Sequence, residues 1–378
     1  MNWIEKMIAE QCPNGVKKVK LGDVCEKITD GSHNLPPTVE FSDFRMISSQ
    51  NIYNTRLDFH GIRYLEKEGY EKENKRTYVE KDNVLLTIVG AIGRCYVVKK
   101  EDLPFTCQRS VCVIKLNKDK YNPYFLHECI IGMSSTLERQ ANGAAQKGLY
   151  LKQVAQIEIP LPPLSIQKEI VSVLDKFSEL IEKTDEEIAL RQKQYEYYRE
   201  KLLTFEKGEV KKVSSFAELK AGKAISAKEL SEIKDNEHQY PCFGGNGIRG
   251  YINKKSHTGN YAIIGRQGAL CGCVSWATGD FYATEHAVVV TPKKGYDSRF
   301  LFYFFTNANL NQYKSQGAQP GLAVSNLNEL KYALPSLSRQ QEIVATLDKF
   351  ETLISKLKEE RELRQKQYEY YREKLLTF

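Results

Sequence analysis

The sequence has no long apolar run and no dense cluster of cysteine or histidine. No stretch approaches the roughly 18 apolar residues that a membrane span needs, and acidic residues interrupt the apolar start of the chain. We therefore expect neither a membrane anchor nor a secretory signal peptide. The nine cysteines are an odd number without paired metal-ligand spacing. This pattern predicts buried, reduced thiols in a cytoplasmic protein, with no metal site.

Motifs of common nucleotide-hydrolysing and DNA-modifying enzymes are also missing. The chain has no Gly-x4-Gly-Lys-Ser/Thr loop for ATP, and no Pro-Asp dipeptide of the common nuclease core. Asn122-Pro-Tyr-Phe125 lacks the second proline of the amino-methyltransferase motif, and Gly245–Gly250 fits G-x-G-x-x-G without a long helix after it. The six histidines are scattered without ligand spacing. We expect no catalytic residues and no cofactor on this chain.

The composition is that of a globular protein large enough for two cores. Of the 378 residues, 41% are hydrophobic and 27% are charged, which argues against a disordered chain. The net charge of +7 is concentrated in the two variable segments, while the repeated segments described next are nearly neutral. This distribution suits variable parts that face a polyanion and repeated parts that face protein.

One peptide, Arg-Gln-Lys-Gln-Tyr-Glu-Tyr-Tyr-Arg-Glu-Lys-Leu-Leu-Thr-Phe, occurs unchanged at Arg191–Phe205 and Arg364–Phe378. The same offset of 173 residues aligns the chain without a gap back to Leu161 and Leu334. A repeat of this length fixes the architecture as two tandem modules. The expected segments are two globular parts at 1–160 and 210–333, with repeated helical spacers at 161–209 and 334–378.

Both repeated segments carry a mostly apolar stripe at alternating spacings of four and three residues. Over 170–205 and 343–378 it runs for about five heptads, which is typical of a long coiled-coil helix. We expect Ser165 and Ser338 as the N-caps, with Gln341 at the capping-box distance in the second copy. A lone stripe must be buried, and each helix serves as the partner of the other. Chain connectivity favours an antiparallel pair, related by an approximate two-fold axis.

Clustered tyrosines mark the end of each repeat. Two of them lie off the apolar stripe, so an exposed aromatic surface for a protein partner is one interpretation. The alternative is that these rings close the ends of the coiled coil. The candidate partner-binding residues are Tyr195, Tyr197, Tyr198, Tyr368, Tyr370 and Tyr371.

The two variable parts show short strand-like runs broken by glycine turns. Asn83–Arg94 and Asn260–Gly268 each combine a buried strand with a glycine turn and one arginine. Helical stretches follow at 124–133 and 299–307. Because strands and helices do not alternate regularly, we predict an α+β fold for both parts, each a mixed α/β domain.

Several motifs carry a specific resemblance: Leu161–Ile170, Leu334–Ile343, Leu174–Phe177 with its copy, Gly22–Val24 and Asn246–Tyr251. On these motifs the chain resembles the specificity subunit of a Type I restriction-modification system over essentially all of its length. The family implies two target-recognition domains, each reading one half of a split DNA site, and paired helices that set the unread gap. It also implies docking of two methyltransferase (modification) subunits, with restriction subunits joining afterwards. S-adenosylmethionine, Mg and ATP would be held by those partners.

Polar loops on a β scaffold are suited to reading base edges, since arginine binds guanine and Asn or Gln amides bind adenine. The alternative for each loop residue is simple solvation or phosphate contact. The candidate DNA-binding residues are Ser32, His33, Asn34, Gln50, Asn51, Arg94, Gln108, Arg109, Gln146, Lys147, Lys223, Asn246, Arg249, Arg266, Gln267, His286, Gln316 and Gln319.

Two other functions remain open at this point. One is a coiled-coil scaffold that never binds DNA, and the other is the specificity subunit of a fused methyltransferase-nuclease system. Salt-dependent DNA binding distinguishes a DNA-binding protein from a scaffold, because phosphate contacts release counterions. The identity of a copurifying methyltransferase distinguishes the two restriction systems.

Overall fold

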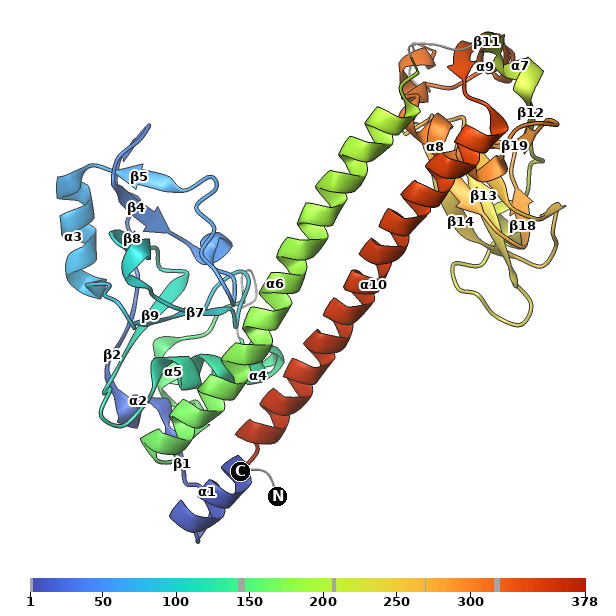
Figure 1. The fold of residues 1–378 in the computed structure, drawn as a ribbon. Helices are drawn as coiled ribbons and strands as arrows, with labels where there is room; N and C mark the ends of the chain where they lie inside the picture. Colours follow the sequence, from blue (N-terminus) through green and yellow to red (C-terminus); the bar gives the residue numbers. More distant parts are fainter. Residues whose placement is uncertain (1–2, 142–146, 206–208, 269, 316–319) are drawn as a thin grey trace. The chain divides into compact units, whose positions relative to one another are not determined.

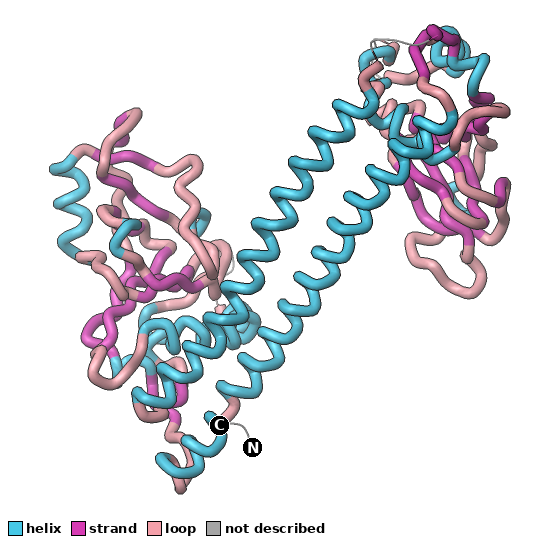
Figure 2. The backbone as a smooth tube through the Cα atoms, viewed as in Figure 1, coloured by secondary structure: helices cyan, strands magenta, loops and turns pink. Residues whose placement is uncertain are grey.

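The computed structural model describes residues 3–141, 147–205, 209–268, 270–315 and 320–378. These residues form two compact units, which we call the first and the second unit (Figure 1). The first holds Met1–Lys183 and Arg361–Phe378, and the second holds Thr184–Glu360. Both long helices, α6 (Leu164–Leu203) and α10 (Leu337–Leu376), therefore contribute to each unit. Figure 2 shows that the strands are confined to the globular parts and that both long helices are uninterrupted.

The first unit contains two four-stranded sheets. The sheet β2-β9-β6-β7 is antiparallel, with strands at Cys25–Asp30, Val111–Leu116, Val84–Thr87 and Cys95–Val97. The sheet β3-β5-β4-β8, in which β4 and β8 are parallel, has strands at Thr38–Val39, Arg63–Leu65, Phe44–Ile47 and Phe105–Cys107. The remaining elements are β1 (Lys18–Lys20) paired with β10 (Glu158–Pro160), and α1 to α5 at Trp3–Gln11, Leu21–Val24, Lys67–Thr77, Pro123–Gln140 and Leu151–Ala155.

The second unit repeats the antiparallel sheet and the parallel pair of the first, but its outer strand β15 pairs with β18, whereas β3 of the first unit pairs with β5. Its antiparallel sheet β12-β19-β16-β17 has strands at Ala217–Ala221, Ala287–Pro292, Tyr261–Gly265 and Val274–Ala277. Its other sheet, β14-β13-β18-β15, contains the parallel pair β13 and β18, with strands at Gly247–Ile252, Tyr240–Gly244, Asp280–Ala283 and His257–Thr258. The remaining elements are β11 (Glu209–Lys212) paired with β20 (Lys331–Leu334), and α7, α8 and α9 at Val213–Phe216, Ser298–Asn307 and Val324–Glu329.

The predicted α+β class is confirmed, and strand β6 shows why its sequence is continuously apolar. Val84 and Leu86 lie in the core that also contains α4, whereas Leu85 lies in the core between the two sheets. Successive side chains of a strand point to opposite faces, so a strand covered on both faces is apolar at every position. In β16, Ile263 and Ile264 divide between two cores in the same way.

The similar Val-Lys-Lys-Val sequences at Val16–Val19 and Val210–Val213 are not structurally equivalent. Leu21 N donates to Ile157 O, and the matching bond in the second unit runs from Val213 N to Leu330 O. The structure therefore aligns Leu21 with Val213, two residues away from the alignment that the similar peptides suggest. The predicted segment boundaries at 160, 209 and 333 follow chain order and stay predictions.

In each unit the two long helices run antiparallel. Phe177 stacks on Tyr371 in the first unit, with ring centroids 5.2 Å apart, and Arg364 donates to Leu180 O over 3.1 Å. In the second unit the reciprocal pair, Tyr198 and Phe350, stacks at 5.4 Å. Thus the same two positions of the repeat meet in both units, which confirms the predicted antiparallel pairing.

The predicted N-caps are wrong. Helix α6 already begins at Leu164, and the hydroxyl of Ser165 donates to the side-chain oxygen of Gln11 instead. Helix α10 begins at Leu337, so Ser338 is inside its first turn, and the hydroxyl of Ser336 accepts from Arg339 N at 3.4 Å. An N-cap must lie just before the first helical residue, and Ser336 holds that position. The capping box proposed for Gln341 therefore does not form.

A buried glutamine near the start of each long helix joins that helix to its globular domain. Gln167 Oε1 accepts from Asn122 N at 2.7 Å, and Gln167 Nε2 donates to Pro162 O at 2.8 Å. Gln340 makes the equivalent contacts with Asp297 N (3.0 Å) and Pro335 O (2.9 Å). Both glutamines are fully buried. Since Asn122 and Asp297 are the N-caps of α4 and α8, each glutamine holds a domain helix against the repeat.

Replacing Gln340 with alanine should leave Asp297 N and Pro335 O without partners. Each buried, unpaired main-chain group costs about 1–3 kcal/mol. We therefore expect Gln340→Ala to lower the unfolding temperature of the full chain by several degrees in calorimetry. Gln341→Ala, at the exposed neighbouring position, is the matched control and should leave that temperature unchanged. Equal unfolding temperatures for the two variants would contradict this role.

Candidate nucleic-acid interface

In the first unit, main-chain hydrogen bonds hold the turn between β8 and β9 against the end of β4. Gln108 N donates to Ile47 O at 2.8 Å. The segment after β2 crosses the same point, where Ser32 N donates to Cys107 O at 2.7 Å and Arg109 N donates to Ser32 O at 2.8 Å. The turn is thus fixed from both sides by main-chain bonds.

The second unit has the same crossing at the turn between β18 and β19. Thr284 N donates to Phe243 O at 2.9 Å, and Lys223 N donates to Ala283 O at 3.1 Å. The crossing requires glycine, because a Cβ at Gly31 would overlap Cys107 O and one at Gly222 would overlap Ala283 O. Only a residue without a side chain allows main chains to approach this closely.

In both domains a third segment bonds to the same turn: the residues after β6 in the first unit and those after β16 in the second. Ile88 N donates to Ser110 O, and Arg266 N donates to His286 O, each at 2.9 Å. Together these bonds align the two domains residue by residue. We use the term crossing loops for the turn between β8 and β9 with the segments after β2, β4 and β6, and for the turn between β18 and β19 with the segments after β12, β13 and β16. The side chains at equivalent positions differ: Gln50 and Asn246, Val89 and Gln267, Arg94 and Cys273, Arg109 and Glu285, Ser110 and His286.

Five of the predicted DNA-binding residues line one groove of about 840 Å³ in the first unit. The groove is open and polar, and three arginines give it positive charge against the single carboxylate of Asp58. Sequence analysis missed Arg63, His60 and Ser110, which line the same groove. The five predicted residues are Gln50, Asn51, Arg94, Gln108 and Arg109.

The side chains of these groove residues differ in their exposure and in their contacts within the protein. Asn51 is buried, with its Oδ1 accepting from Ser48 N at 2.9 Å and its Nδ2 donating to Asp58 O. Arg94 lies over the ring of Tyr53 at 4.8 Å. In contrast, the Arg109 side chain is exposed. Asn51 therefore shapes the groove, while Arg109 is available for a ligand.

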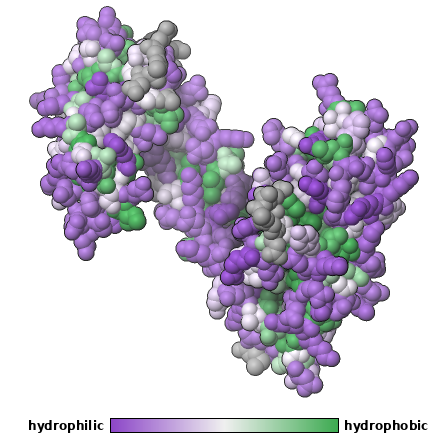
Figure 3. All heavy atoms as spheres, turned by 180° about the vertical axis from the view of Figure 1, so that it is seen from behind, coloured by the Kyte–Doolittle hydropathy of each residue, from purple (hydrophilic) through white to green (hydrophobic). Residues whose placement is uncertain are grey.

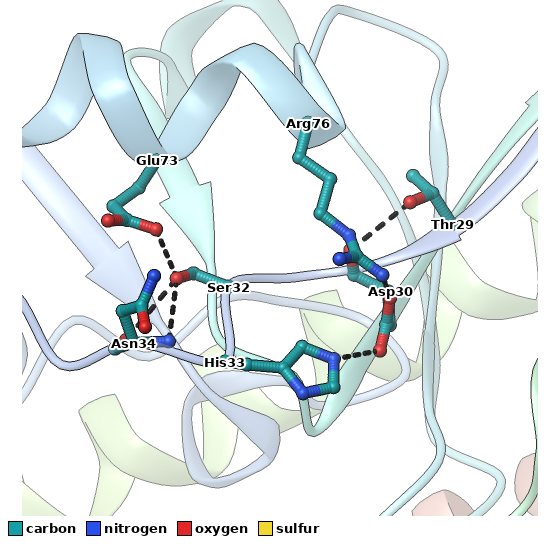
Figure 4. Close-up of polar contacts among 7 residues, drawn as sticks. All are labelled: Thr29, Asp30, Ser32, His33, Asn34, Glu73 and Arg76. Carbon is teal, nitrogen blue, oxygen red and sulfur yellow. Dashed lines mark hydrogen bonds and ion pairs between the residues drawn. The ribbon is translucent and has the colours of Figure 1, made fainter.

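Ser32, His33 and Asn34 lie beside this crossing, and Ser32 contacts α3 (Figure 4). The Ser32 hydroxyl is buried and donates to the carboxylate of Glu73. Asp30 pairs with Arg76 of α3, and its Oδ2 lies 2.6 Å from His33 Nε2. Ser32 thus attaches α3 to the loop and its side chain is unavailable to DNA, whereas His33 is exposed on one side.

In the second unit, the predicted Lys223, Asn246, Arg249 and Gln267 are exposed. Arg266 is half-buried, and its Nε has no hydrogen-bond partner within the described residues. His286 Nε2 lies 3.0 Å from Glu285 Oε1. Glu285 lies at the same turn and is not among the residues predicted from the sequence.

Three predicted contacts, Gln146, Gln316 and Gln319, lie outside the described residues. Lys147 is exposed and precedes Gly148, which bridges to Val89. In the second unit Gly321 makes the equivalent bridge to Gln267. Gly148 and Gly321 therefore lie beside the crossing loops of their own domains.

The tyrosines of the repeat divide into buried and exposed pairs. Tyr368 OH donates to the buried Glu128 at 2.6 Å, and burial with this carboxylate raises the pKa of Tyr368. Burial beside Glu351 raises the pKa of Tyr195 to about 12. Their neighbours in the sequence are exposed, with Tyr197 at 57% and Tyr370 at 59%. The buried pair is structural, and the exposed pair is free to meet a partner.

Each exposed tyrosine forms one surface with the next residue of its helix. The rings of Tyr197 and Tyr198 are 5.3 Å apart at 77°, and those of Tyr370 and Tyr371 show the same distance and angle. On the face of the molecule shown in Figure 3, apolar residues form scattered patches on a mostly hydrophilic surface. We call the two tyrosine pairs the aromatic surfaces.

Within the part of the chain that the structure describes, no group of His, Cys, Asp and Glu side chains is arranged to bind a metal ion. The same residues include no helix of the length and apolarity needed to span a membrane. All nine cysteines are free thiols, but Cys273 is exposed, against the expectation of burial.

The structure therefore defines a two-domain protein with repeated helices and two polar loop clusters on one shared main-chain arrangement. The family model described as Type I restriction modification DNA specificity domain matches residues 13–190 and 206–365. The chain belongs to this family. The resemblance seen in the sequence is thereby confirmed.

Individual relatives agree with this assignment. The EcoprrI specificity subunit of Escherichia coli is 50% identical over 208 residues, covering 53% of this chain and 52% of the relative. A putative type I specificity subunit of Haemophilus influenzae is 31% identical over 191 residues, covering 48% and 49%. The chain thus spans about half the length of these relatives. The solved specificity subunit of Mycoplasma genitalium, with a TM-score of 0.62 and 14% identity over 96% of both chains, shares the fold.

Replacing Gly222 with alanine should displace the crossing in the second unit, because the new methyl group would overlap Ala283 O. Such overpacking typically costs about 1–3 kcal/mol. We expect a lower unfolding temperature in calorimetry of the full chain. Gly132→Ala is the control, since this helical glycine of α4 has open space around it and should become more stable by about 1 kcal/mol. A neutral Gly222→Ala variant would show that the crossing is not tightly packed.

Proposed function

We propose that this chain is the DNA-reading specificity subunit of a Type I restriction-modification complex and has no catalytic activity of its own. Each globular domain reads one half of a bipartite site through its crossing loops. The chain meets its DNA in the cytoplasm. Cofactors of the reactions, S-adenosylmethionine, Mg and ATP, belong to partner subunits.

The observation that carries this proposal is the pairing of one main-chain arrangement with two sets of side chains. A protein that reads two different short sequences needs the same rigid support twice and different hydrogen-bonding groups at its ends. Gln50 and Asn246 illustrate this, because both are exposed amides at the same position after β4 and β13. The arginines of the first groove supply the positive charge that phosphate contacts require.

The proposed protein partners are two methyltransferase subunits, with restriction subunits joining afterwards. The two aromatic surfaces support this stoichiometry, since they have identical sequence and identical ring geometry in both units. Exposed tyrosines supply contact area at low entropic cost and are enriched in protein interfaces. A solved relative of similar fold, 16% identical with a TM-score of 0.57, comes from a study of complex assembly of a type I restriction-modification system.

Specific DNA binding should weaken steeply with salt. If the two domains together contact six or more phosphates, the affinity should fall by on the order of 10³-fold between about 50 mM and about 200 mM salt. Fluorescence anisotropy with a duplex selected from a random library measures this dependence. A chain that binds no duplex at low salt would be a scaffold, and the proposal would fail.

The gap between the two half-sites should follow the length of the long helices. One heptad inserted after Lys183 and another after Glu360 would lengthen both helices by about 10 Å, which is about three base pairs. Library selection should then return half-sites whose spacing has grown by that amount, with unchanged bases. Insertion into only one helix is the control, since it breaks the pairing. An unchanged gap in the double insertion would show that the helices do not set it.

Alanine at Tyr197 or Tyr370 should remove one methyltransferase docking surface each. We expect each single variant to copurify with one methyltransferase copy and the double variant with none, since a central tyrosine contributes about 2 kcal/mol or more. Mass photometry of the purified complexes gives the stoichiometry. The control is Tyr150→Ala, an exposed tyrosine outside the repeat. Two bound copies on the double variant would place docking elsewhere.

A further inference from the structure

Arg109 and Glu285 occupy structurally equivalent positions in the two domains, and their side chains carry opposite charges. Arg109 follows Gln108, whose N donates to the end of β4, and Glu285 follows Thr284, whose N donates to the end of β13. Two residues further on, Val111 N donates back to Gln108 O and Ala287 N donates back to Thr284 O, at 2.9 and 3.0 Å. Each side chain therefore leaves a tight turn at an equivalent point.

The main chain at both positions is rigid. Ser32 O accepts from Arg109 N at 2.8 Å, and the crossing in the second unit is closed by Gly222 N, which donates to Ala287 O at 3.0 Å. The glycines of the crossing leave no space for a side chain between the crossing strands. A group presented from such a support keeps its position, as hydrogen-bond readout of a base requires.

The carboxylate of Glu285 is unusual on a surface that faces a polyanion. It is repelled by phosphates, so it contributes to DNA binding only where it accepts hydrogen bonds from a base. Its side chain is 39% exposed, and Oε1 lies 3.0 Å from His286 Nε2. Oε2 is enclosed and has no hydrogen-bond partner within the described residues, so its capacity to accept a donor is not used by a protein group.

The chemistry of the major groove distinguishes the bases that these two groups accept. Arginine donates two parallel bonds to O6 and N7 of guanine. A carboxylate accepts from the exocyclic amine of cytosine, whose major-groove edge offers this donor alone. Adenine also offers an amine, but its N7 acceptor beside that amine repels the second carboxylate oxygen. The two charges therefore match opposite members of the G·C pair.

We propose that Arg109 and Glu285 are specificity-determining residues of the two domains. Arg109 selects guanine at one position of the first half-site, and Glu285 selects cytosine at one position of the second. His286 orients the carboxylate. This inference rests on the proposed function and adds the base that each position selects.

The test is selection of binding sites from a randomised duplex library by the full chain and its variants. In Glu285→Gln the side chain keeps its shape but carries an amide, which binds adenine through N6 and N7. We expect one cytosine of one half-site to change to adenine, with preference for cytosine at that position falling at least about fivefold. Arg109→Gln should change one guanine of the other half-site to adenine.

The control is Glu218→Gln, an exposed acid at the end of β12 remote from Gly222, which should leave every base unchanged. Unfolding temperatures of all variants verify that they are folded. If the wild-type chain enriches a bipartite site but Glu285→Gln retains the same cytosine, this inference is wrong and the proposed function stands. If the wild-type chain enriches no sequence, the proposed function itself fails.

Discussion

The structure depends on one tight contact between main chains. In each domain the segment after the first long strand crosses the end of a parallel strand pair, and Gly31 or Gly222 makes the approach possible. The main-chain bonds at this crossing do not involve side chains, so they impose the same geometry on two dissimilar sequences. The side chains that project from it are therefore free to differ, and Arg109 and Glu285 differ even in charge. Constant support with variable projecting groups is what a pair of sequence readers requires.

The repeated helices provide a second constant element. Gln167 and Gln340 attach each domain by bonds to main-chain groups, N–H of an N-cap residue and a proline carbonyl, so the attachment does not depend on the sequence of the domain. Side-chain contacts nearby do depend on it. Arg299 of the second domain pairs with Asp348 at 2.9 Å, whereas the first domain uses Glu128 to accept from Tyr368. The main-chain bonds are the same in both domains, and the side-chain contacts around them differ. Domains of dissimilar sequence can therefore attach to the repeat in the same way.

The sequence predicts the parts of this architecture that depend on local patterns. The exact repeat and its apolar stripe predict both helices, and the turn at Asn246 and several groove residues are found where polar loops were expected. What it could not predict depends on register and long-range packing. Ser336 is the cap because the helix begins at Leu337, two residues earlier than a cap at Ser338 requires, and Asn51 is buried because its loop folds back on Asp58. Glu285 was missed because its significance appears only when the strands align it with Arg109.

The central claim is that the two domains are interchangeable readers on one support, and exchanging them tests it directly. Replacing residues 212–331 with residues 20–158 would place the first domain at both positions, joined at structurally equivalent points of the strand pairs. Library selection with this chain should return a site whose two half-sites are identical and match the first half-site of the wild-type chain. Retention of the original second half-site, or loss of all sequence preference by a folded chain, would contradict the account.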